Sequence, residues 1–139
     1  MIPINTLKYL AAQKLKDSEC LFKGGRYTGA IYLMGYALEL SFKRKICFSL
    51  GFTNGFPETP AEFNNYSTQI GTFNAINTGL LLSYLKQLKT HDLKVLITFS
   101  GADYRILSLY FDDWESIKNW SPEDLYKRVL YNQTKTKAF

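Results

Sequence analysis

The sequence has few of the residues that build metal or redox sites. It contains two cysteines, Cys20 and Cys47, without CxxC spacing, and a single histidine, His91. A structural zinc site needs four grouped cysteine or histidine ligands, so this supply argues against one, and no cofactor is indicated. Isolated thiols of this kind suit a reducing compartment.

Long apolar runs are also missing. None approaches the roughly 20 residues that a membrane-spanning helix requires. The first residues lack the charged-then-apolar pattern of a secretory signal, and we therefore expect a cytoplasmic protein with no membrane partner. The net charge is +5, but the 17 lysines and arginines are spread along the chain, which permits nucleic-acid binding without indicating it.

What is present suits one folded domain covering residues 1–139. A chain of 139 residues, 46% of them hydrophobic, is large enough to bury one core without disulfides. Apolar residues recur at helical spacing, which predicts an all-α fold of about five helices. The helices are expected over 7–22, 26–50, 80–88, 92–100, 102–111 and 122–131. Residues 51–77, rich in glycine, proline and asparagine, predict a long loop with room for one short helix.

The segment 26–50 is the most informative, because its apolar residues point in almost every direction around a helix. A helix that is apolar all round is buried all round. The exception is Glu39, because a buried carboxylate needs partners, and Lys43 lies one turn later. Two interpretations stay open for Glu39 and Lys43: a structural ion pair, or a role in ligand binding or at a dimer interface.

Two further pairs are candidate ligand-binding residues. His91 and Asp92 lie at an expected helix start, where they either cap the helix or contact an anion at its amide groups. Arg26 and Tyr27 follow the double glycine that ends the first helix, and they either hold a phosphate or cap the helical domain. No residue pattern identifies a catalytic group beside the lone histidine.

Three stretches together resemble the HEPN domain family. They are residues 25–43, GRYTGAIYLMGYALELSFK, then 90–93, THDL, and 120–126, WSPEDLY. The resemblance implies an antiparallel up-and-down helical bundle that pairs into homodimers. It further implies a ribonuclease toxin, a partner of a nucleotidyltransferase, or a binding module, and it adds Tyr36 to the candidate ligand-binding residues.

One departure separates this chain from the catalytic members that it resembles. Those members carry an arginine, four to six further residues and then a histidine. Here the three positions that would serve His91 hold Tyr84, Leu85 and Lys86, and no arginine elsewhere precedes a histidine at that spacing. Lysine lacks the planar fork of arginine. We therefore expect a non-catalytic homodimer that binds a nucleotide, nucleic acid or a nucleotidyltransferase, with a divergent ribonuclease toxin of a toxin-antitoxin or defence system as the alternative.

Overall fold

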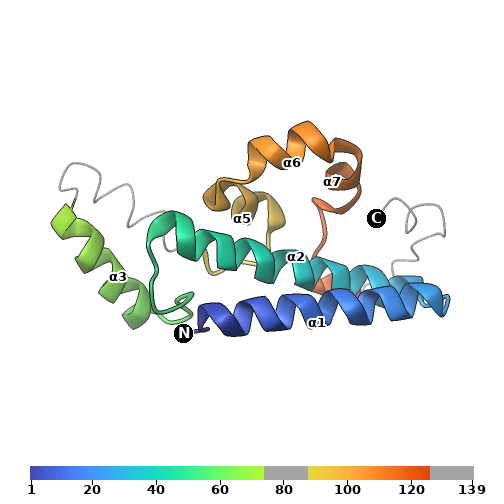
Figure 1. The fold of residues 1–139 in the computed structure, drawn as a ribbon, viewed down its shortest axis with the longest axis horizontal. Helices are drawn as coiled ribbons and strands as arrows, with labels where there is room; N and C mark the ends of the chain where they lie inside the picture. Colours follow the sequence, from blue (N-terminus) through green and yellow to red (C-terminus); the bar gives the residue numbers. More distant parts are fainter. Residues whose placement is uncertain (74–87, 126–139) are drawn as a thin grey trace.

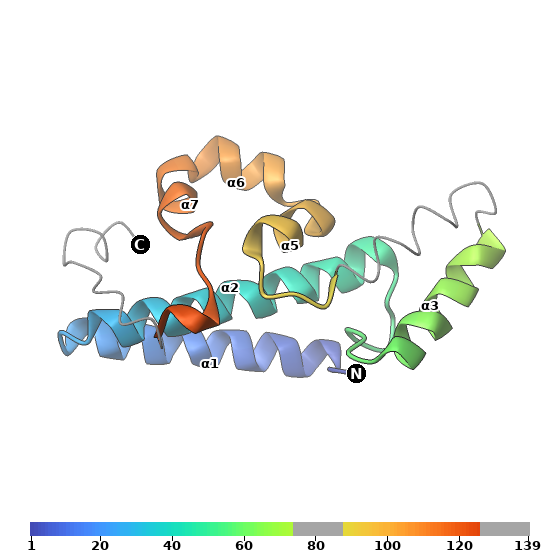
Figure 2. The same ribbon diagram turned by 180° about the vertical axis from the view of Figure 1, so that it is seen from behind.

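Two long helices run antiparallel and side by side along the molecule: α1 (Ile4–Lys23) and α2 (Tyr27–Leu50), as Figures 1 and 2 show. They belong to a computed structural model that describes residues 1–73 and 88–125. The chain reverses at Gly25, whose φ of 76° lies in the left-handed region that glycine tolerates. The break predicted at the double glycine is thus confirmed.

The predicted burial of α2 is confirmed. No residue between Tyr27 and Leu40 is exposed. α1 covers one side of α2, while α5 (Leu93–Ser100) and the short 3-10 helix η2 (Pro122–Leu125) pack on others. The core between these elements includes Ile31 and Ile46, which are almost fully buried. α2 is apolar around its whole circumference, and other elements cover most of that surface.

Residues 51–77, predicted as a long loop with room for one short helix, contain α3 (Pro60–Phe73), which is longer than that prediction suggested. Thr59 Oγ1 accepts the backbone N–H of Glu62 at 3.2 Å, and Glu62 Oε2 accepts the N–H of Glu58 at 2.9 Å. With Pro60 at the first helical position, this is a capped helix start. The capping residues at the start of α3 favour a helix more strongly than the asparagines that follow favour a turn.

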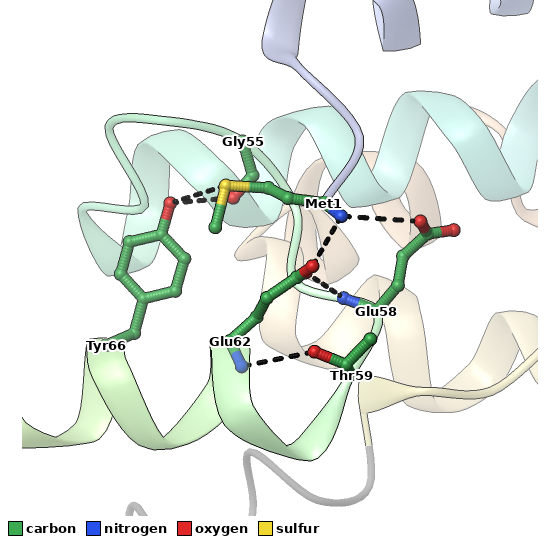
Figure 3. Close-up of polar contacts among 6 residues, drawn as sticks. All are labelled: Met1, Gly55, Glu58, Thr59, Glu62 and Tyr66. Carbon is green, nitrogen blue, oxygen red and sulfur yellow. Dashed lines mark hydrogen bonds and ion pairs between the residues drawn. The ribbon is translucent and has the colours of Figure 1, made fainter.

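The first residues of the chain tie α1 to the start of α3 (Figure 3). The Met1 amino group contacts Glu62 Oε1 at 2.7 Å and Glu58 Oε2 at 3.5 Å. The hydrogen bond to Glu62 raises the pKa of the amino group and lowers the pKa of the Glu62 carboxyl. The Tyr66 hydroxyl donates to the Gly55 carbonyl at 2.9 Å, and burial raises the pKa of this hydroxyl.

Gly55 permits this close arrangement. Its φ is 140°, and a Cβ at this position would lie 2.3 Å from the Ile2 carbonyl oxygen. Ile2 and Phe56 exchange two backbone hydrogen bonds of 2.8 and 2.9 Å, which form an isolated bridge. Within residues 1–73 and 88–125 there is no strand, so the all-α prediction is confirmed for that part of the chain.

Short helices form an arch over α2 (Figures 1 and 2). After α5 come α6 (Asp103–Leu109) and α7 (Phe111–Ile117). The helix predicted over 102–111 therefore ends early, because Tyr110 leaves the helical conformation with φ −134° and ψ 36°. The sequence patterns did not predict α7. Most of the helix expected over 80–88 and the end of that expected over 122–131 lie outside the described residues.

None of the described helices combines the length and the apolar character needed to cross a membrane.

Candidate functional site

The buried carboxylate of Glu39 is the centre of the site. Its side chain is 3% exposed, on the middle of α2. The Lys43 ammonium, one turn along the same helix, donates to Oε1 at 2.7 Å, so the predicted partner is confirmed. Lys43 Nζ also lies 5.2 Å from the centre of the Phe56 ring. Two opposite charges are thus paired in a largely desolvated position, where each depends on the other.

His91 is the second partner of Glu39, from a position 52 residues away. Its Nδ1 lies 2.9 Å from both carboxylate oxygens. An ionised carboxylate only accepts hydrogen bonds, so Nδ1 carries the proton and donates it. In the neutral ring, Nε2 then carries a lone pair. The imidazole is 59% exposed, so Glu39 fixes one edge of the ring while the other edge remains accessible.

The backbone before α5 is held by its own polar side chains. Asp92 is the N-cap of α5, and its Oδ1 accepts the N–H of Lys94 at 2.9 Å. The Thr90 hydroxyl accepts the N–H of Asp92 at 3.0 Å. The capping role predicted for Asp92 is confirmed. These bonds hold the short connection that carries His91 across α2.

Aromatic rings form one wall of the site. Tyr36 packs edge-to-face on Trp120 with ring centres 5.1 Å apart, and on His91 at 6.3 Å. Trp120 lies directly against Gly35, where a Cβ would come 2.0 Å from the indole Cε2. Only glycine allows the indole this close to α2. The rings therefore join α2, the α5 connection and the segment before η2.

A cleft of about 540 Å³ lies beside His91. It falls in the size range of small-ligand sites. It is lined by Thr90, His91, Asp92, Lys94, Lys118, Asn119, Trp120, Ser121, Pro122 and Glu123. Lys94 Nζ donates to Asn119 Oδ1 at 3.4 Å, and Lys118 pairs with Glu115 at 2.8 Å. The cleft thus presents two ammonium groups, an imidazole and the carboxylates of Asp92 and Glu123, with Lys118 already paired and Asp92 engaged in capping.

The structure brings together five of the seven candidates: Tyr36, Glu39, Lys43, His91 and Asp92. The remaining two lie at the α1–α2 turn, about two and a half helical turns before Tyr36. Arg26 is exposed there as the N-cap of α2, and Tyr27 packs on Phe22 with ring centres 5.4 Å apart.

Several cleft residues went unrecognised in the sequence. Lys94, Lys118 and Asn119 look like ordinary surface residues, whereas the other lining residues stood in the THDL and WSPEDLY stretches. The one signal available was their position, because Lys94 follows the capping Asp92 and the other two directly precede Trp120.

Metal and thiol chemistry find no support at this cleft. Across residues 1–73 and 88–125, no three histidine, cysteine, aspartate or glutamate residues are grouped as metal ligands. Cys47 is buried in the core, and burial raises the pKa of its thiol to about 11. Cys20 is exposed on α1.

Comparison with known proteins does not assign the chain to a family. No protein-family model matches it, and no curated protein or solved structure matches it significantly.

Proposed function

We propose that this protein is a HEPN-like binding module whose cleft beside His91 takes a phosphate-bearing ligand, such as a nucleotide or the backbone of an RNA. The observation that carries the proposal is the contact between His91 and the buried carboxylate of Glu39 at the cleft edge. A carboxylate that is only 3% exposed is costly unless it is paired, and Glu39 is paired with both Lys43 and His91. Here it orients the one histidine toward a cleft that also presents two lysines.

The groups at the cleft that can attract an anion are two lysines, which lie beside the carboxylates of Asp92 and Glu123 in the same lining. Lys94 and Lys118 supply ammonium groups that bind phosphate as point charges. The hydroxyls of Thr90 and Ser121 add donors with rotatable hydrogens. The Asp92 carboxylate keeps its negative charge while its Oδ1 accepts the backbone N–H of Lys94. A ligand phosphate in this cleft would approach the open Nε2 edge of His91.

Ligand-induced thermal stabilisation tests the proposal directly. Inorganic phosphate and a panel of nucleoside monophosphates are titrated against the full chain, and the midpoint of unfolding is recorded. A ligand at 100 times its dissociation constant should add about 2.7 kcal/mol of stability. The Lys94→Ala/Lys118→Ala double variant should lose this shift. The control is Lys89→Ala, an exposed lysine that does not line the cleft. No shift with any phosphate compound would contradict the proposal.

The same contact favours a second candidate, a divergent ribonuclease. A carboxylate that holds Nδ1–H leaves the other ring nitrogen, Nε2, accessible as a proton acceptor or donor, as general acid-base catalysis requires. Lys94 or Lys118 would then supply the positive charge that the missing arginine provides in the family that the sequence resembles. This reading differs from the first only in whether a bound RNA is cut.

An RNA cleavage assay separates the two candidates. Purified protein is incubated with mixed RNA in EDTA, and fragments are followed over time. The ribonuclease candidate predicts cleavage that His91→Ala abolishes and Lys89→Ala leaves unchanged. RNA that stays intact, together with a phosphate-dependent thermal shift, supports the binding module. In cells, the ribonuclease also predicts growth arrest that His91→Ala relieves.

A further inference from the structure

Another pocket lies between α2 and the arch that α6 and α7 form over it (Figures 1 and 2). Its volume is about 220 Å³, which is below the range of drug-sized ligand sites and leaves room for a small compound. None of its lining residues belongs to the cleft beside His91. The pocket under the arch is therefore a separate site, and an inference about it does not rest on the proposed phosphate ligand.

Three aromatic rings line this pocket. Phe42 of α2 and Trp114 of α7 pack edge-to-face with ring centres 6.2 Å apart. These two side chains are 4% and 7% exposed, so the core holds both rings in place. Tyr110 adds a third ring from the junction of α6 and α7. The face of an aromatic ring attracts a cation that comes within about 6 Å of the ring centre.

The one charge in the lining of the pocket is negative. Asp113, in the first turn of α7, is the only ionised side chain among the described residues that line it. Within residues 1–73 and 88–125 the Asp113 carboxylate has neither an ion pair nor a hydrogen bond, so it is available to a ligand. Aromatic rings beside a carboxylate are complementary to an organic cation.

The polar groups of the lining narrow the kind of cation. Its only side-chain oxygens belong to Tyr110 and Asp113. A calcium ion takes about six to eight oxygen ligands, which these two residues do not supply. A primary ammonium group carries three N–H donors, and each would need an acceptor. A fully methylated ammonium group has the charge without the N–H donors, so aromatic rings and one carboxylate suffice for it.

We propose that the pocket under the arch binds a small quaternary ammonium compound of the choline class. Its methylated nitrogen lies among the rings of Phe42, Trp114 and Tyr110, and its positive charge faces Asp113. The ligand also adds contacts between α2 and the arch, where α6 has no buried residue of its own.

Titration with choline and with its neutral carbon analogue tests the proposal. In the analogue a tert-butyl group replaces the trimethylammonium group, so the shape is kept and the charge is lost. Calorimetry on the full chain should show choline binding about tenfold more tightly than the analogue. Asp113→Asn should weaken choline binding about tenfold as well, because it removes the opposite charge. The matched control is Asp112→Asn, the same change at the neighbouring exposed aspartate, which does not line the pocket.

The indole N–H signals in a proton NMR spectrum show where choline binds. The chain has two tryptophans, and only Trp114 lines this pocket. With the signals assigned from Trp114→Phe, choline should shift the Trp114 signal and leave that of Trp120 unchanged.

Four results would overturn the proposal. They are no binding of choline, equal affinity for choline and its neutral analogue, an Asp113→Asn variant that binds choline as the wild type does, and a choline-dependent shift confined to Trp120. The phosphate-dependent thermal shift reports on the cleft beside His91 and should persist in Asp113→Asn. Failure at one site therefore remains distinguishable from failure at the other.

Discussion

Gly35→Ala is a sharp probe of how Trp120 packs on α2. A Cβ at Gly35 would lie 2.0 to 2.2 Å from three indole atoms, well inside van der Waals contact. The indole has little room to retreat, because Trp120 is 6% exposed and its ring also packs on Tyr36. Alanine should gain up to about 1 kcal/mol in helix propensity. Overpacking of this kind costs about 1 to 3 kcal/mol, and a clash with a rigid ring belongs at the upper end.

The net expectation is a loss of about 2 kcal/mol in the free energy of unfolding, equivalent to a fall of about 8 °C in Tm for a domain of this size. The assay is urea unfolding at 25 °C with a parallel thermal melt. The matched control is Gly29→Ala on the same helix. There the new Cβ meets only the flexible end of Leu21, at 3.2 Å, so the propensity gain should leave Gly29→Ala as stable as the wild type or more so.

A double variant tells the clash from other effects. In Gly35→Ala/Trp120→Leu the indole is gone, so the combined loss should be smaller than the sum of the two single losses. If Gly35→Ala were as stable as Gly29→Ala, or if the two losses simply added, the close approach of Trp120 to α2 would be refuted.

Three further predictions follow from buried and paired groups. Glu39→Ala leaves the Lys43 ammonium without its carboxylate and should lower the free energy of unfolding, measured in urea, by about 3 kcal/mol or more. The double variant Glu39→Leu/Lys43→Met should lower it much less. Equal losses in the two variants would contradict the paired burial. In native protein at pH 8 a thiol reagent should modify one cysteine per chain, Cys20, because Cys47 is buried with a pKa of about 11, and both should react in denaturant. The Met1 amine has a raised pKa, so its contribution to stability is complete below its ordinary pKa of 8.0 and is lost as pH rises through the pKa in the folded protein. The Glu62 carboxyl has a lowered pKa, so its contribution is lost as pH falls below about 4.5. The Tm difference between wild type and Glu62→Gln should therefore be widest between these two limits, and a difference independent of pH would refute the contact.

The helical core could be predicted from the sequence because its signals are local. Apolar residues around the whole of α2 indicate burial without knowledge of what covers them. The Glu39 and Lys43 pair follows from their spacing of four on a helix. α3 was predictable in principle, because Thr59, Pro60 and Glu62 form a helix-start signature, but the asparagines around it hid the helical period.

The rest of the site depends on how the chain crosses itself. His91 reaches Glu39 only because the segment before α5 passes over α2, and a separation of 52 residues gives no local signal. Lys94 and Lys118 meet at one cleft for the same reason. The place of Trp120 beside Gly35 likewise depends on the tertiary fold, although the small residues of α2, Gly35 among them, were a hint of close approach. Sequence patterns identify residues that need partners, and the fold decides which partners they find.

The contact between Glu39 and His91 is the central claim, and nitrogen NMR of the imidazole tests it most directly. His91 is the only histidine in the chain, so a nitrogen-15 spectrum contains one imidazole to assign. At a pH where the ring is neutral, the wild type should carry its proton on Nδ1, and Glu39→Ala should shift the proton toward Nε2. A wild-type ring protonated on Nε2, or a spectrum that Glu39→Ala leaves unchanged, would contradict the account.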